Sequence, residues 1–551
     1  MAVTFLYPLV IFINFTKDRA IFMPFASSAQ TRTLVNPSRA RRGSVLTWPS
    51  ATVIALAAVL TGCASVTPSA MPNSEQRALL QTDRARAVMQ SEPVSASLSL
   101  HEAVARSLKY NLEHRSQLMA QAIALGTADL TRYDMLPKVM ANAGYNNRNN
   151  DFLTRSRDPQ GNFLTTPPFT TSSREYTNTG LALSWNLLDF GVSYYTAQQN
   201  ADRFLQAGEK RRRTMHLLIQ EVQVAYLRAA TAQQLEAQLS TTITQARQAL
   251  SSASQSEQAG LRDPLDALRY QRNLIESVRV LSTIHQEMAS AMVDLNQLLN
   301  LPPATRYQLQ EPQSLPVPGN PPNTSMEELE ARALANNAQL RESIYEARIA
   351  AIETRKSLVR LFPSINVNTA AQQSNNAHYV NQSWVETSAQ LSFNLWNLLL
   401  IPQTRELAKA NGELAEHRRM MVQMAILGQV HVAQLQLQHA QEVHEHANAA
   451  DAVEMRIASI THTRNAEGAA SEAERIVANT AAIVARLRRS QALSQLYAAH
   501  ARLQSTVGME PQISALHETS LTDLTASVSR SFDAWQAGQL PSLDGAQTST
   551  R

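Results

Sequence analysis

The chain is an internal duplication, and this limits its possible folds more than any other feature of the sequence. An offset of 226 residues places Asn111 on Asn337. Farther along, an offset of 208 places residues 183–187 (LSWNL) on residues 391–395 (LSFNL). The difference, 226 − 208 = 18 residues, falls in segment 151–174, whose Thr, Ser, Pro and Arg content predicts a loop. One unit therefore folds twice, with a longer loop in its first copy.

Each copy begins with a pattern typical of a helix, followed by two short alternating segments. The helices are expected over about 99–134 and 325–360, and Pro137 and Pro363 end them. Apolar and small or polar residues then alternate with period two. This predicts strands over about 138–149, 177–188, 364–373 and 385–396.

The alternation is typical of a transmembrane barrel, because about ten residues suit a tilted strand across a bilayer. A soluble hairpin packed on a core is the alternative, but Asn, Ser and Gln recur on one face and favour a wet lumen. The apolar face supplies the candidates for contact with lipid, which are Leu181, Leu183, Trp185, Leu391 and Phe393.

A long helical hairpin follows the second strand of each copy, over about 193–301 and 403–508. From Ser193 to Ser256 there is one glycine and no proline, and apolar residues step by three and four as in a coiled-coil seam. Gly260 and Gly468 interrupt the pattern in the two copies. About 65 residues at ~1.5 Å each give a rod of roughly 100 Å. A globular domain does not need such a rod, whereas a protein that crosses a periplasm does.

The single cysteine, Cys63, follows three arginines, an apolar run over residues 53–60 and the sequence Leu-Thr-Gly. This resembles a bacterial lipobox, and we expect Cys63 to be lipidated. An ordinary signal peptide and a transmembrane anchor are the alternatives, although the run is short for a bilayer. The start codon is expected downstream, so that residues 1–37 are not made. An extra membrane-active leader is the alternative.

The formal charge of +4 is misleading about binding partners. Residues 1–62 carry six basic residues and one acid, a net of +5. The remainder is therefore 4 − 5 = −1, and no electrostatic case exists for nucleic-acid binding.

Four strands cannot close a barrel, and an open sheet edge cannot face lipid. Known barrels start at about eight strands, so a trimer with twelve would leave a wider lumen than a dimer. The expected fold class is mainly α with a small β part, with long coiled-coil hairpins forming a periplasmic tube on a trimeric 12-stranded outer-membrane barrel. A lipid-anchored periplasmic coiled-coil tether or adaptor without a channel is the alternative.

Over roughly residues 97–512 the chain resembles the TolC-like outer membrane factors, in particular their lipoprotein branch. The resemblance rests on Cys63, on the helix-to-proline entries at Pro137 and Pro363, on residues 183–191 (LSWNLLDFG), and on the first hairpin tip, residues 259–268. It implies a leader over 1–62, a lipidated extension over 63–97, a first repeat over 98–311, a linker over 312–324, a second repeat over 325–511 and a tail over 512–551.

The resemblance also implies a function and partners. Such proteins are homotrimeric ducts in outer-membrane lipid that conduct substrate passively in tripartite efflux or type I secretion. They dock on a periplasmic adaptor (a membrane fusion protein) and an inner-membrane pump, or on a type I secretion exporter. They carry no catalytic site and need no cofactor. Acidic rings at the helix tips can bind cations. Carried over by position, the tip candidates are Asp266 and Glu474, beside Gly260 and Gly468.

Two departures weaken the expectation of a second acidic ring. Val477 stands where the family often has another acid, and Ala470 stands where a gating arginine can occur. A solvated helix charge is the alternative for Glu474. The histidines His431, His439, His444 and His446 share one long helix, but their spacing does not predict a metal site.

Overall fold

A computed structural model describes residues 69–89, 92–165, 167–259, 263–310, 316–318, 325–511 and 519–537. The expected lipidation site Cys63, the leader and Gly260 lie outside these residues. The chain divides into two units, residues 1–76 and 77–551, and the second contains the duplicated fold. Helix α2 (Asn73–Met89) begins in the first unit and ends in the second.

The first repeat contains five helices and the two strands of one hairpin. The helices are α3 (Leu100–Tyr110), α4 (Leu112–Tyr133), α5 (Leu187–Gln258), α6 (Pro264–Ala289) and α7 (Ala291–Leu298), and the strands are β2 (Lys138–Asn147) and β5 (Glu175–Asn186). Short pairs of strands lie beside them, β1 (Ser97–Leu98) with β6 (Gln308–Leu309), and β3 (Leu153–Thr154) with β4 (Phe169–Thr170).

The second repeat has the same order of elements. Its helices are α8 (Met326–Asn336), α9 (Ala338–Val359), α10 (Trp396–Ala466) and α11 (Glu472–Val507), and its strands are β7 (Ser364–Ser374) and β8 (Ser383–Ser392). A final helix, α12 (Leu521–Gln536), packs on α3.

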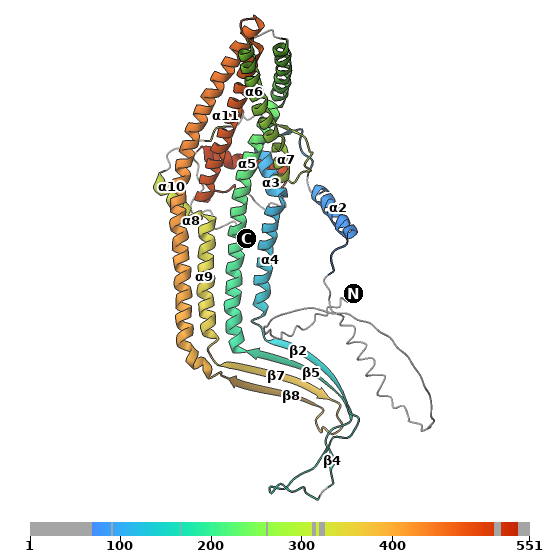
Figure 1. Ribbon diagram of the computed structural model, residues 1–551. Helices are drawn as coiled ribbons and strands as arrows, with labels where there is room; N and C mark the ends of the chain where they lie inside the picture. Colours follow the sequence, from blue (N-terminus) through green and yellow to red (C-terminus); the bar gives the residue numbers. More distant parts are fainter. Residues whose placement is uncertain are drawn as a thin grey trace, which may run out of the picture. The chain divides into compact units, whose positions relative to one another are not determined.

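The two hairpins form one antiparallel sheet in the order β2-β5-β7-β8, which extends from the ends of α4, α5, α9 and α10 (Figure 1). Next to the sheet the helices pack in the order α4, α5, α9, α10. Farther along, α6 packs on α5, α5 on α11, and α11 on α10. The helix α5 is therefore interior, whereas α10 lies at an edge over its whole length.

Three sequence predictions are corrected. Each expected entry helix, 99–134 and 325–360, is two helices, because Asn111 and Asn337 leave helical geometry with ψ of 127° and 123°. The return helix of the first repeat also breaks at Ser290, while α11 is continuous. The long helices begin earlier than expected, at Leu187 and Trp396, and α10 continues through Pro402.

The strand prediction also changes at one candidate residue. Strand β8 ends at Ser392, so Phe393 lies beyond the strand that was expected to contain it. Helix α10 starts three residues later, inside the expected range 385–396. The fold class itself is confirmed as mainly helical with a small strand part.

Candidate functional site

The four-stranded sheet has one apolar and one polar face. In an antiparallel sheet, directly paired residues project from the same side. Leu183 pairs with Val139 of β2 and Thr369 of β7, and Leu181 pairs with Ala141 and Ala371. The same face carries Trp185 and Val367, with Ile365 and Leu391 beside them. The register therefore places on one face the four candidates for lipid contact that lie on strands.

The opposite face is polar and partly hydrogen-bonded between the repeats. The Ser184 hydroxyl donates to Asn366 Oδ1 at 3.3 Å, and Asn186 Nδ2 donates to Ser364 Oγ at 2.8 Å. A sheet with one apolar and one polar face suits a boundary between lipid or protein on one side and water on the other.

The outer sides of β2 and β8 have no neighbouring strand within the described residues. Each edge strand therefore presents a row of unpaired backbone N–H and C=O groups. Such an edge is a template for pairing with a further strand.

The edge helix α10 is exposed where the equivalent helix α5 is buried. In α5, the buried Gln199 contacts Lys356 Nζ at 2.7 Å and Glu353 Oε2 at 2.8 Å. Its counterpart in α10, 208 residues on, is Leu407, which is 64% exposed. The sequence adapts the same helix to an interior position in one repeat and to an apolar surface in the other.

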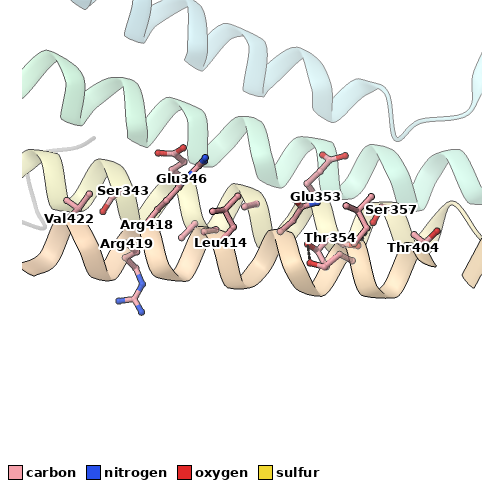
Figure 2. A pocket seen from close by; sticks show the side chains of 16 residues that line it. Ser343, Glu346, Glu353, Thr354, Ser357, Thr404, Leu414, Arg418, Arg419 and Val422 are labelled. Carbon is pink, nitrogen blue, oxygen red and sulfur yellow. Dashed lines mark hydrogen bonds between the residues drawn. The ribbon is translucent and has the colours of Figure 1, made fainter. Parts of the chain in front are cut away.

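A groove of about 320 Å³ lies between α9 and α10. Figure 2 shows its lining, with Glu346 and Arg418 at one part and Thr354 and Ser357 at another. At the equivalent place in the first repeat, Asn200 Nδ2 of α5 donates a 2.8 Å bond to Thr131 Oγ1 of α4. The residue equivalent to Asn200 in the second repeat is Ala408, which lines the groove and has no side chain that could form such a bond.

The two helical tips are built differently. At the second tip, Gly468 has a φ of +72°, and the Ala469 N–H donates to the Arg464 carbonyl at 2.7 Å. Glu474 forms a capping box with Ser471, whose N–H donates to Glu474 Oε2 at 2.7 Å. The Glu474 carboxylate is exposed to solvent beside this cap.

At the first tip, Asp266 is exposed and lies in the first turn of α6, 3.7 Å from Arg269. Asp263 caps this helix by accepting from the Leu265 and Asp266 N–H groups. The structure places both acidic candidates at tips, one on each hairpin.

Comparison with known proteins agrees with this geometry. Residues 103–301 match the family model of the outer membrane efflux protein. The chain carries an outer membrane efflux protein domain. The matched range covers most of the first repeat, and no curated protein matches the chain.

The fold of this efflux domain and of its second copy is shared with solved outer-membrane channels. The outer-membrane channel OprN is 18% identical, with a TM-score of 0.57 over 75% of this chain and 90% of that one. The CmeC channel of Campylobacter jejuni is 13% identical, with a TM-score of 0.59 over 78% and 89%. The open state of the Neisseria gonorrhoeae MtrE channel is 17% identical, with a TM-score of 0.54 over 77% and 96%.

A buried ionic cluster links the first repeat to the second, and sequence reasoning missed it. Glu209 of α5 is buried and accepts from Arg212 at 2.5 Å and from Arg341 of α9 at 2.8 Å. Arg212 also bonds Glu510, just after α11. Burial raises the pKa of Glu510, but the nearby His216 side chain, 3.7 Å away, and the Arg212 guanidinium outweigh burial, so its pKa lies below the usual value.

The helices were also compared with the length and apolar character that a membrane-spanning helix needs. Among the described residues, none of the helices is both long and apolar enough to cross a membrane. Within the same residues, no group of three or more His, Cys, Asp or Glu side chains is placed to hold a metal ion. His431 instead contacts Glu330 at 2.7 Å, and His444 is buried.

Proposed function

We propose that the protein is the outer-membrane duct of a tripartite efflux or type I secretion system. Three copies would combine their four-stranded sheets into one barrel of twelve strands, and the helices would continue it as a periplasmic tube. Substrate would pass passively, without a catalytic step, after docking with a periplasmic adaptor and an inner-membrane pump. The repeats 98–311 and 325–511 are the proposed building units.

One observation carries this proposal: a sheet with one apolar face and two unpaired edges is continuous with very long helices. Pairing β8 of one copy with β2 of the next would satisfy both edges. It would also place the exposed leucines of α10 against α4 of the neighbour. The 72 residues of α5, at about 1.5 Å each, give roughly 110 Å, which suits a periplasmic span.

The side chains at the two boundaries of the duct are part of the proposal. Leu181, Leu183, Trp185 and Leu391 would face lipid, and Phe393 would lie just beyond the strand. Asp266 and Glu474, beside Gly260 and Gly468, would border the periplasmic aperture. Lipidation of Cys63 would anchor the chain to the outer membrane in addition to the barrel.

Planar-bilayer recording of the purified full chain tests the duct directly. We expect a trimer in detergent and discrete single-channel conductance. A protein that stays monomeric and never conducts would reject the duct in favour of the periplasmic tether. Cell fractionation of Cys63→Ala separates the two as well, because a tether needs its lipid whereas a barrel stays in the membrane without it.

A further inference from the structure

The connection between β2 and β5, residues 148–174, forms an arm at the end of the sheet farthest from the helices (Figure 1). We call it the outer arm. The equivalent connection in the second repeat is only residues 375–382 and contains no arginine. The outer arm contains Arg148, Arg155, Arg157 and Arg174. The extra residues of the first repeat thus brought positive charge to this end of the sheet.

The base of the outer arm is fixed by polar contacts. The Arg174 guanidinium donates two bonds of 2.7 Å to the two carboxylate oxygens of Asp151. The Ser173 N–H donates to Asn376 Oδ1 at 3.0 Å, and Asn376, which is fully buried, donates to Ser172 Oγ at 3.0 Å. Asn376 belongs to the second repeat, so the base of the arm is tied to both repeats.

The tip of the outer arm is a closed turn that engages its second acidic side chain. The Asn162 N–H donates to Asp158 Oδ1 at 2.7 Å, and Gly161 has a φ of +89°. Since Arg174 occupies Asp151, both carboxylates of the arm are already in use. Neither forms an ion pair with the remaining three arginines, and the four arginines and two aspartates give the arm a net charge of +2.

Three exposed guanidinium groups therefore remain beside aromatic rings. Arg155 and Arg157 lie 5.9 and 4.1 Å from the centre of the same Phe163 ring, and Arg148 lies 4.5 Å from the Phe152 ring. Within the described residues, no ion pair involves any of these three arginines. Large apolar side chains that are 43–58% exposed surround them, namely Phe152, Leu153, Phe163, Leu164 and Phe169.

We propose that the outer arm binds the anionic, phosphate-bearing headgroups of the membrane leaflet next to the outer ends of the strands. This inference rests on the proposed function, which places the sheet in a membrane. A guanidinium presents a planar fork of donors that matches phosphate oxygens. The neighbouring phenyl rings are apolar enough to enter the boundary between headgroups and acyl chains. Phe163 holds Arg155 and Arg157 on one ring, so two charges meet one headgroup region.

The positive charge of the outer arm favours anionic lipid as its binding partner over the outer arm of a second copy. Arms from neighbouring copies would each bring a net charge of +2, and like charges repel at close range. An anionic leaflet attracts the arginines. Each arginine near its surface increases the affinity for the leaflet roughly fivefold. Two arginines should therefore account for about 30-fold.

The test titrates the detergent-solubilised full chain with short-chain phosphatidylglycerol by calorimetry. Short-chain phosphatidylcholine is the zwitterionic reference, and inorganic phosphate is the soluble-anion reference. In Arg155→Gln/Arg157→Gln, we expect phosphatidylglycerol affinity to fall about 30-fold, with little change for phosphatidylcholine. The control Arg269→Gln/Arg279→Gln removes the same charge from exposed positions on α6 and should bind like wild type.

Three results would overturn the inference: equal affinity in wild type and the arm variant, binding of inorganic phosphate as tight as that of phosphatidylglycerol, or an arm variant that changes only the oligomeric state. Conductance of the same wild-type preparation is recorded in parallel. A conducting protein without lipid selectivity rejects the arm and keeps the duct. Selective lipid binding without conductance supports the arm and rejects the duct.

Discussion

Asn337 Nδ2 donates a hydrogen bond of 2.8 Å to the carbonyl oxygen of Thr506. The first repeat contains the same bond, from Asn111 Nδ2 to the Leu298 carbonyl at 3.1 Å. In both repeats the asparagine Oδ1 also caps the helix that follows. In each repeat, one asparagine therefore separates the first two helices and caps the second of them. The same side chain also bonds that point of the chain to the end of the helix that returns from the tip.

The two roles of Asn337 can be separated by substitution. Asn337→Ser keeps a capping oxygen but cannot reach Thr506, so it loses only the tether. Asn337→Ala loses both. We expect Asn337→Ser to lower the free energy of unfolding by about 1–2 kcal/mol, and Asn337→Ala by about 1 kcal/mol more. Denaturant titration in detergent measures both. Equal stability of all three proteins would show that the break is set by packing instead.

Gly508 ends α11 in the left-handed conformation, at a point where its backbone closely approaches the end of α8. Its φ is +76°, and an added Cβ would lie 2.4 Å from the backbone oxygen of Asn336. Gly508→Ala should therefore cost about 2–4 kcal/mol of stability, because neither backbone can yield cheaply.

Gly412→Ala is the matched control, since a Cβ there meets nothing within 4 Å and lies inside α10. Alanine is the better helix former, so this variant should gain up to about 1 kcal/mol. Thermal unfolding of the two variants side by side checks the contrast. A Gly508→Ala protein as stable as Gly412→Ala would contradict the close approach.

Neighbouring positions in β5 test the two faces of the sheet. Leu183 lies on the apolar face and Ser184 on the polar face. If the apolar face meets lipid, Leu183→Arg should cost about 2–4 kcal/mol, whereas Ser184→Arg should be tolerated. Yield of folded, membrane-extracted oligomer measures the difference. Equal yields would remove the reason to place this face against lipid.

The repeating pattern made much of this fold predictable from the sequence. Period-two alternation predicted all four long strands, and the step of three and four predicted the long helices. The pairing register of the strands determines which residues lie on each face of the sheet, because a shift of one residue would exchange apolar Leu183 with polar Ser184. Helix starts were harder, since a helical pattern does not show where a strand ends. Asn186 caps α5 seven residues before the expected start.

Features that depend on distant residues were not predicted. Asn111 and Asn337 had been aligned, yet their role depends on carbonyl groups far along the chain. Their conserved register between the copies was the available signal. The Glu209–Arg212–Glu510 cluster gave no such signal, because the positions equivalent to Glu209 and Arg212 in the second repeat are His417 and Met420.

Glu474 is both a helix cap and a candidate aperture charge, and two variants distinguish these roles. Glu474→Gln keeps the capping box but removes the charge, while Glu474→Ala removes both. If Glu474 lines the aperture, both variants should weaken block of single channels by divalent cations. If it only caps α11, Glu474→Gln should behave as wild type, and Glu474→Ala should lose about 1 kcal/mol of stability. Asp266→Asn tests the charge alone at the first tip, because Asp263 is the capping residue there.

Stability should depend on pH through His500, which is buried in α11. Burial lowers its pKa from 6.5 to about 4. Between these values the unfolded chain binds a proton that the folded chain excludes, so stability is fully present above pH 6.5 and falls as the pH drops toward 4. The loss is on the order of 3 kcal/mol. His500→Leu should therefore flatten the decrease of thermal stability over this window, while the exposed His462→Leu controls for loss of an imidazole. An unchanged slope in His500→Leu would show that other groups set the acid sensitivity.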